Sequence, residues 1–426
     1  MKKVFVLLLL LMLPLLSVVV QAQDEEIVTL TWWATERGRD TAETRDLHFQ
    51  LARAFEAEHP GIQVAVSLYP SRGFGTRVFT AIAAGDGPDI WYNFYATDIA
   101  SQGFLEDLTP YMEASDVDEG WFESARRRAV YEDHYYGAPR DAVSSFIAYN
   151  KDIFDAAGVA YPEEGWTIAD YRSIAEQLND PDNEVYGAGG IEGGEGCMLW
   201  SLFSFNLGGN ITSEDGRQVV GYLDSPETIE AMRWCLELTE VASPASMAEQ
   251  FGEVTFMSGD VGMQAISDWE VPALQEQATF NWGVIGAPRF NEDTEVEPWA
   301  DSYIYYMWSG SEHKDEAWQL IEYLTGPEAQ RVAAEAGVWA PNGPAIWEEL
   351  GWDQDEVAGV SYSQLVNSEL TPNYLRSQFF FDCVGGPLTD VRVRWLEGGE
   401  RDLETMMGEA AQIAQACLDD NYASMQ

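Results

Sequence analysis

The sequence predicts an α/β protein with mainly parallel sheets, because strand-like and helix-like segments alternate from residue 28 onward. Residues 28–34 and 63–69 are short apolar runs typical of strands. The segment between them has one apolar helical face, formed by residues that recur every fourth position: Leu47, Leu51 and Phe55. A second helix is expected over residues 74–84. This order favours a parallel sheet with helices packed on its faces.

A tight turn and a third strand follow the second helix. Residues 85–88 (Gly-Asp-Gly-Pro) combine two glycines, which allow a sharp reversal, with a proline that cannot continue a helix. The strand over residues 89–92 then leads into Asn93 and Tyr95. Because ligands bind at the carboxyl ends of strands in open α/β sheets, we expect both side chains near a binding site.

The same alternation continues along the chain. Further strands are expected within residues 136–150, 256–266, 280–288 and 302–308, and further helices over residues 168–178, 226–241 and 314–324. Thr167 is placed to cap the first of these helices. No internal repeat or low-complexity linker separates the segments, so we expect two α/β lobes with more than one crossing between them.

Residues 1–22 have the features of a secretory signal peptide. Lys2 and Lys3 precede an apolar run over residues 4–16, and Val-Gln-Ala at 20–22 forms a small-residue cleavage site. The run is shorter than the ~20 residues of a permanent membrane span. No cysteine stands at the cleavage site, so no lipid anchor is expected. The sequence thus predicts an exported protein, periplasmic or extracellular.

The composition excludes several classes of partner. A formal net charge of −49 repels phosphate backbones and anionic lipids, so nucleic-acid and membrane-surface roles are not expected. The acidic residues are spread along a chain that is 46% hydrophobic, which indicates a folded, acid-coated globule rather than a disordered tail.

Four cysteines fit an oxidising compartment and two disulfides. Three pairings are open, and we expect Cys197–Cys235 with Cys383–Cys417, because each pair joins neighbouring segments. A zinc site is disfavoured, since no two cysteines have a C-x-x-C type of spacing.

Five motifs resemble, in their order, the bacterial solute-binding proteins that feed ABC importers, in particular the sugar-binding, maltose-binding-protein-like branch. They are the Gly-Asp-Gly-Pro-Asp turn with its aromatic run, the Gly-Ala-Pro and Tyr-Asn-Lys-Asp-Ile-Phe elements at 137–139 and 149–154, the segment 256–263, Asp268-Trp269, and the segment 311–330. The resemblance extends over most of residues 28–345. Later residues are assigned only by analogy.

This resemblance implies a two-lobed periplasmic-binding-protein fold, each lobe a mainly parallel sheet flanked by helices, joined by a hinge near 140–143 and 302–303, with a further crossing near 342. We expect residues 23–141 with 303–342 to form the N-terminal lobe. Residues 142–302 with 343–426 are expected to form the C-terminal lobe.

A sugar site needs flat aromatic rings for stacking and charged or amide groups for paired hydrogen bonds. Trp269 stands where the family carries a ligand-stacking tryptophan. Other candidates lie just beyond predicted strands, at the lobe crossings, or in loops. The candidate ligand-binding residues are Glu36, Arg37, Asn93, Tyr95, Arg140, Asp141, Trp200, Trp269, Trp299, Asp301 and Trp339.

Several of these have a structural alternative. Arg140 and Asp141 could form a buried ion pair at the hinge instead of binding hydroxyl groups. Trp200 could pack between helices, and Trp339 could cover the core. Thr35 belongs to the same loop region as Glu36, whereas Trp32 shares the inward face of its strand and is expected in the core.

No catalytic motif stands out. The four histidines (His48, His59, His134 and His313) lie apart and are expected to be structural or solvated. No nucleophile elbow, P-loop or dinucleotide fingerprint is present. We therefore expect a binding protein that is not an enzyme and needs no cofactor or metal.

The expected function is capture of a sugar or oligosaccharide by lobe closure and its delivery to an ABC transporter permease, by a monomer. Two alternatives stay open. One is a secreted carbohydrate-active enzyme, a hydrolase or lyase. The other is a receptor for a polyol, a glycerol-phosphate-like compound or a short peptide.

Overall fold

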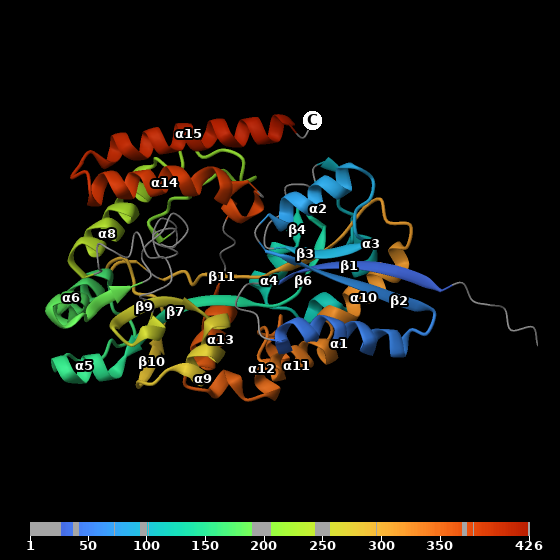
Figure 1. The fold of residues 1–426 in the computed structure, drawn as a ribbon, viewed down its shortest axis with the longest axis horizontal. Helices are drawn as coiled ribbons and strands as arrows, with labels where there is room; N and C mark the ends of the chain where they lie inside the picture. The colour runs from blue at the N-terminus through green and yellow to red at the C-terminus, as the bar shows by residue number, and fades with distance from the viewer. Residues whose placement is uncertain are drawn as a thin grey trace, which may run out of the picture.

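The computed structural model describes residues 27–36, 42–71, 73–93, 100, 102–189, 206–242, 256–294, 296–368, 373–377 and 379–424. Within these residues the chain forms two lobes, each with its own sheet and surrounding helices (Figure 1). The predicted signal peptide (1–22), Arg37, Tyr95, Cys197 and Trp200 lie outside the described residues. None of the helices formed by the described residues has the length and apolar character needed to cross a membrane.

The first lobe has a five-stranded sheet in the order β2-β1-β3-β12-β6. Its strands are β1 (Val28–Glu36), β2 (Ile62–Pro70), β3 (Ile90–Asn93), β6 (Gly137–Pro139) and β12 (Ile304–Met307). Its helices are α1 (Ala42–Glu58), α2 (Phe74–Ala83), α3 (Thr109–Met112), α4 (Glu123–Arg128), α10 (Lys314–Thr325) and α11 (Pro327–Glu335), and a small hairpin pairs β4 (Val130–Tyr131) with β5 (His134–Tyr135).

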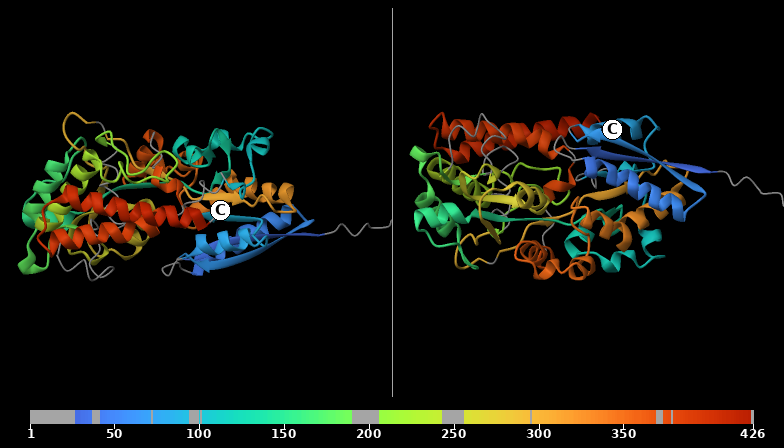
Figure 2. Two further views of the ribbon diagram at one scale, coloured as in Figure 1. Left: turned by 90° about the horizontal axis from the view of Figure 1, so that it is seen from above. Right: turned by 60° about the horizontal axis from the view of Figure 1, so that its bottom comes forward.

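The second lobe has a sheet in the order β10-β7-β9-β8, and the short β11 also pairs with β7. Its strands are β7 (Val143–Asn150), β8 (Tyr186–Gly189), β9 (Val261–Ser267), β10 (Trp282–Ile285) and β11 (Ala300–Asp301). Around them lie α5 (Lys151–Ala157), α6 (Ile168–Leu178), α8 (Pro226–Ala242), α9 (Val271–Gln277), α14 (Phe380–Leu396) and α15 (Leu403–Ser424). Helices α14 and α15 run side by side along this lobe (Figure 2).

Helices α12 (Pro344–Glu349) and α13 (Ala358–Asn367) lie at the junction of the lobes, separated by the 3-10 turn η7 (Trp352–Gln354). A small hydrophobic cluster joins them to α4 and to both lobe crossings. Its buried members are Phe122, Ala125, Ala142, Ala300, Trp347 and Leu365. Apolar packing therefore continues across the junction. The remaining 3-10 turns are η2 (Val117–Gly120), η3 (Pro181–Asn183), η5 (Phe256–Ser258), η6 (Asp268–Glu270) and η8 (Asn373–Arg376).

The elements form where the sequence predicts them. The predicted inward face of α1 is buried in the first-lobe core, together with Trp32, and its members are Leu47, Leu51 and Phe55. Thr167 caps α6 in a capping box with Asp170. Gly85 has a φ of 76°, the left-handed conformation that the predicted turn required. Asp89 accepts hydrogen bonds from the backbone and hydroxyl of Thr31, which ties the start of β3 to β1.

One strand in each sheet runs against the others. β1 pairs in parallel with β2 and β3, whereas β12 is antiparallel to β3 and β6. In the second sheet β8 and β9 are parallel, and β7 is antiparallel to β9 and β10. β7 and β12 are the strands that enter each lobe directly after a crossing. In each sheet, therefore, all strands but one point the same way, and every antiparallel pairing involves the strand that enters from the other lobe.

The two crossing segments lie side by side. The Arg140 amide donates to the Tyr303 carbonyl at 2.7 Å, and the Tyr303 amide donates to Asp141 Oδ1 at 2.8 Å. A third segment joins them, because the Ala142 amide donates to the Ala340 carbonyl at 3.2 Å. These contacts occur where the sequence predicts the hinge, and the exact division of the chain into lobes stays a prediction.

The expected disulfide between Cys383 and Cys417 is confirmed, and it links α14 to α15. Cys235, on α8, is also disulfide-bonded, while its expected partner Cys197 lies outside the described residues. The Cys383–Cys417 bridge joins residues 34 positions apart, and this cross-link reduces the number of conformations available to the unfolded chain.

We predict that the double variant Cys383→Ala, Cys417→Ala lowers the free energy of unfolding by about 3–4 kcal/mol, because a loop of this length loses that much closure entropy in the unfolded state. Urea unfolding followed by circular dichroism measures the difference. The single variants report the effect of an unpaired thiol and serve as controls. Equal unfolding midpoints for the double variant and the wild type would contradict this prediction.

Candidate functional site

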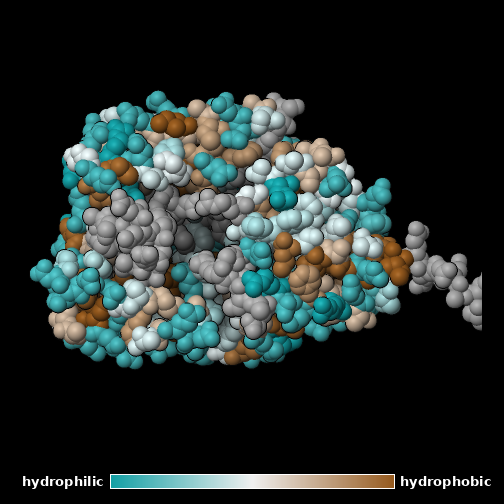
Figure 3. Space-filling model, in the orientation of Figure 1, coloured by the Kyte–Doolittle hydropathy of each residue, from teal (hydrophilic) through white to brown (hydrophobic). Residues whose placement is uncertain are grey.

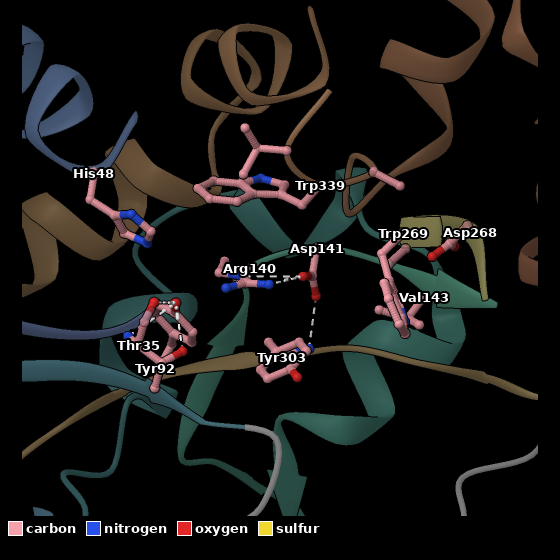
Figure 4. Close-up of a pocket in the computed structure, with 13 residues that line it drawn as sticks. Thr35, His48, Tyr92, Arg140, Asp141, Val143, Asp268, Trp269, Tyr303 and Trp339 are labelled. Carbon is pink, nitrogen blue, oxygen red and sulfur yellow. Dashed lines mark hydrogen bonds and ion pairs between the residues drawn. The ribbon is translucent and has the colours of Figure 1, made fainter. Parts of the chain in front are cut away.

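A pocket with about 560 Å³ of open space lies where the lobes meet. In the space-filling view the surface is hollowed between the two lobes (Figure 3). Both lobes and all three crossing segments contribute side chains (Figure 4). The lining residues are Thr35, His48, Tyr92, Arg140, Asp141, Ala142, Val143, Asp268, Trp269, Tyr303, Val338, Trp339 and Ala340.

Strand ends position the walls of this pocket. Thr35 and Tyr92 lie near the carboxyl ends of β1 and β3, and Asp268 and Trp269 follow β9. Because the carboxyl edges of both sheets face the junction, a ligand in the pocket would contact both lobes at once. This is the edge at which open α/β sheets bind ligands.

An ion pair between consecutive residues lies at the centre of the pocket. Both Nε and Nη2 of Arg140 donate to Asp141 Oδ2, and both side chains are buried. Burial alone would lower the pKa of Arg140, but the adjacent Asp141 carboxylate outweighs that effect and raises the pKa above its usual value. The guanidinium thus stays charged in a desolvated setting.

Three aromatic rings surround this guanidinium. Its Cζ lies 4.2 Å from the ring centre of Tyr92, 4.5 Å from that of Tyr303 and 4.9 Å from that of Trp339. Cation–π contacts of this kind are stronger when the cation is desolvated. Nη1 has no hydrogen-bond acceptor among the described residues, so this donor is available to a ligand.

The first-lobe wall is held by a hydroxyl contact. Tyr92 OH donates to the Thr35 carbonyl at 3.0 Å and accepts from the Thr35 amide at 3.2 Å. The ring of His48, at the start of α1, stacks on Tyr92 with centroids 5.9 Å apart and also contacts Trp339. His48 is 3% exposed and lines the pocket, so its expected purely structural or solvated role is corrected to a position in the site wall.

The second-lobe wall contains Asp268 and Trp269 on the 3-10 turn η6. Asp268 Oδ2 accepts hydrogen bonds from the Ser144 amide at 2.8 Å and from the Ser361 hydroxyl at 3.3 Å. Desolvation raises the pKa of Asp268 to about 7, against its ordinary 3.8, and the nearby Asp141 charge adds to the rise. Among the described residues, no group of three or more His, Cys, Asp or Glu side chains is arranged to hold a metal ion.

Four of the predicted site residues line the pocket together: Arg140, Asp141, Trp269 and Trp339. Arg140 and Asp141 form the buried ion pair predicted as their structural alternative and also face the pocket, while their binding of ligand hydroxyl groups stays a prediction. Glu36 and Asn93 end β1 and β3 beside the lining residues Thr35 and Tyr92, without lining the pocket themselves. Arg37, Tyr95 and Trp200 lie outside the described residues.

The structure places Trp299 and Asp301 elsewhere. Trp299 is buried in the second-lobe core. Asp301 accepts a hydrogen bond from Arg128 Nε at 2.9 Å in a fully buried ion pair between a first-lobe helix and the crossing strand β11. Neither residue lines the pocket, because each side chain is occupied in packing or pairing. We therefore assign Trp299 and Asp301 structural roles, and the prediction that they bind ligand is corrected.

Sequence reasoning did not select Tyr92 or His48 as ligand-binding residues. Tyr92 could have been found, because it directly precedes Asn93 at the end of a predicted strand. His48 carried no comparable signal. It neighbours the core residue Leu47, and only the approach of the 338–340 segment from far along the chain brings it into the wall.

Comparison with known proteins decides the family. The family model for the bacterial extracellular solute-binding protein matches residues 44–331, more than half of the chain. The chain belongs to this family. Its members are solute-binding proteins and not enzymes, which agrees with the absence of a catalytic motif in the sequence. As a member of an extracellular family, the protein is exported.

Individual relatives agree with this assignment. The maltotriose-binding protein of Pyrococcus abyssi is 26% identical over 301 residues, which cover 67% of this chain and 61% of that protein, less than two thirds of its length. A putative ABC transporter periplasmic-binding protein of Escherichia coli (strain K12) is 27% identical over 396 residues, or 87% of this chain and 88% of that one.

The fold also matches solved structures. An ABC substrate-binding protein of Listeria monocytogenes, in complex with cycloalternan, superimposes with a TM-score of 0.75 at 21% sequence identity, over 93% of this chain and 99% of that chain. At this identity the likeness establishes the fold alone. It confirms the two-lobed α/β architecture that the sequence predicts.

We predict that Asp268 makes the protein less stable as the pH rises. Between about pH 4 and pH 7 the folded state holds a proton on Asp268 that the unfolded state has lost, so stability falls across this window. The variant Asp268→Asn is neutral at every pH. Relative to wild type, it should therefore gain about 1–2 kcal/mol of unfolding free energy between pH 4 and pH 8, a figure reduced for partial solvent exposure.

Urea unfolding of both proteins at pH 4, 6 and 8 measures this gain. Asp293→Asn, in an exposed segment away from the pocket, is the matched control and should show no pH-dependent difference from wild type. A difference between Asp268→Asn and wild type that stays constant with pH would show that this carboxylate does not titrate in the stated window.

Proposed function

We propose that this protein captures a sugar or oligosaccharide between its lobes and delivers it to the membrane permease of an ABC importer. The observation that carries the proposal is a pocket built jointly by both lobes, in which the Arg140–Asp141 pair lies between aromatic side chains. Sugars present hydroxyl edges and apolar C–H faces, and this pocket offers a guanidinium donor beside the rings of Trp269 and Trp339.

Relatives and structural neighbours support a sugar ligand. They include a maltotriose-binding protein, a diacetylchitobiose-binding protein and a substrate-binding protein in complex with cycloalternan. A polyol is the second candidate, because an erythritol/L-threitol-binding protein of Mycolicibacterium smegmatis is 24% identical over 318 residues. No feature of the site supports the enzyme alternative.

The mechanism we propose is a population shift. A ligand that contacts Tyr92 on one lobe and Trp269 on the other binds the closed arrangement better than the open one, so it shifts the equilibrium toward closure. Closure would then present a joint surface of both lobes to the permease. A dissociation constant near 1 μM corresponds to about −8 kcal/mol, which one or two stacked rings and several hydrogen bonds can supply.

The finer localisation belongs to the same proposal. We infer that residues 1–22 are removed as a signal peptide, that the mature protein carries no lipid anchor, and that it acts as a monomer.

The lobes are proposed to comprise residues 23–141 with 303–342, and 142–302 with 343–426.

Isothermal titration calorimetry against mono- and oligosaccharides, polyols and glycerol phosphates tests the proposal. We predict saturable binding of one ligand class, and at least a ~10-fold loss of affinity in Trp269→Ala, because this variant removes a stacking surface from the second-lobe wall. Trp282→Phe is the matched control, since Trp282 is a partly buried tryptophan of the same lobe that does not line the pocket.

The outcomes separate the hypotheses. Saturable sugar binding that Trp269→Ala weakens and Trp282→Phe preserves would support the receptor function and name the ligand class. Absence of binding to every compound by folded protein would contradict the sugar proposal. Release of shortened glycan products would favour the enzyme alternative.

A further inference from the structure

A second pocket adjoins the first. It has about 870 Å³ of open space and shares Asp268, Trp269 and the segment 338–340 with the lobe junction. Its other walls come from β7, α9, α11, α12, η7 and α13, and the residues that they contribute do not line the first pocket. The lining is mainly apolar and aromatic with a few polar groups, which is the composition typical of small-molecule sites.

Four tryptophans dominate this second pocket: Trp269, Trp339, Trp347 and Trp352. Two of them are held rigidly. Trp347 is 1% exposed, and its Nε1 donates to the Pro341 carbonyl at 3.0 Å. Trp352 packs edge-on against Trp347, with centroids 5.4 Å apart and planes at 87°. Trp347 and Trp339 are therefore packed into the floor of the pocket, whereas Trp269 and Trp352 are partly exposed.

The charged lining residues are all acidic. Asp268 and Asp355 line the second pocket, whereas none of the described lysine, arginine or histidine residues does. Asp355 is exposed at the rim, and its Oδ1 accepts hydrogen bonds from the Val357 and Ala358 amides at the start of α13. Its Oδ2 has no hydrogen-bond partner among the described residues.

Two basic residues, Arg140 and Lys151, are paired with acidic side chains and lie outside this lining. Arg140 lines only the first pocket and is bonded to Asp141. Lys151 forms an ion pair with Glu356 at 3.2 Å. The formal net charge of −49 adds a long-range field that attracts cations and repels anions. The acidic lining and the net charge of the whole protein therefore both favour a positively charged ligand.

We propose that the second pocket binds a small organic cation with an apolar body, such as a quaternary ammonium or an aromatic amine. The cation would lie against the partly exposed rings of Trp269 and Trp352 and near the Asp268 and Asp355 carboxylates. Aromatic rings attract cations through their negative faces, and an apolar body gains from burial against the same rings. Most walls of this site lie outside the first pocket, while Asp268, Trp269 and Trp339 line both, so residues that line only the second pocket distinguish the two sites.

Calorimetric titration of the full mature protein with benzyltrimethylammonium tests the proposal, with phenylacetate as an anionic probe of similar size. The titration is run at pH 8, so that Asp268, with its pKa of about 7, is ionised. We expect saturable binding of the cation with a dissociation constant on the order of 0.1–1 mM and no binding of the anion.

Two variants locate the site. Asp355→Asn keeps an acceptor for the α13 amides and removes the charge, and it is expected to weaken cation binding about 3- to 10-fold. Asp353→Asn, two residues away and outside the pocket lining, is the matched control and should leave the affinity unchanged. Trp352→Leu is expected to weaken binding more than ~10-fold. None of the three should alter sugar affinity.

The proposal is overturned if the cation shows no binding at a concentration of about 10 mM, which is 10-fold above the upper end of the expected dissociation constants. It is likewise overturned if phenylacetate binds equally well. It is also overturned if Asp355→Asn and Asp353→Asn lose affinity equally, because the effect would then be that of net charge alone. Displacement of the cation by sugar, with no effect of Trp352→Leu, would place the cation in the first pocket and overturn the proposal as well. The sugar titration of the same variants shows separately whether the receptor function holds.

Discussion

The ion pair of Arg140 and Asp141 is the interaction on which the junction between the lobes depends. Both charges are buried, and removing two charges from water costs several kcal/mol per ion unless other contacts compensate. Here the compensation comes from the chain itself. Asp141 also accepts a hydrogen bond from the Tyr303 amide, and the guanidinium lies among three aromatic rings. The ion pair therefore connects two crossing segments and also forms the centre of the pocket.

Two buried amides extend this arrangement to the third segment. Gln330 Nε2 donates to the Arg140 carbonyl at 2.8 Å, and Gln330 Oε1 accepts from the Asn342 amide at 2.9 Å. Asn342 Nδ2 in turn donates to the Pro139 carbonyl at 2.9 Å. Backbone groups of all three crossing segments are thus satisfied by the side chains of Asp141, Asn342 and, from α11, Gln330. Since unsatisfied buried polar groups are costly, this network favours one arrangement of the three segments.

The sequence predicted the parts of this structure that local chemistry determines. Gly85 predicted a turn, and the apolar face containing Leu51 predicted a helix. The ends of the predicted strands indicated the edge of the sheet at which the site lies. Tertiary contacts between distant segments decided the rest. Asp301 looked available at a crossing, yet Arg128 lies 173 positions away in sequence and bonds to it. His48 enters the pocket wall through contacts with Tyr92 and with Trp339, which lie on two segments distant from it in the sequence. No local pattern encodes either pairing.

The junction also explains how closure can occur without breaking its own network. The hydrogen bonds of Arg140, Asp141 and Tyr303 connect crossing segments to one another, whereas Tyr92 and Trp269 are carried by the two separate sheets. A rotation in the crossing backbone would therefore change the distance between the pocket walls and leave the central ion pair intact. Other contacts also cross the junction, namely the buried Arg128–Asp301 ion pair and the apolar cluster that contains Trp347. The difference in free energy between open and closed states therefore depends on these contacts and on a ligand that contacts both walls.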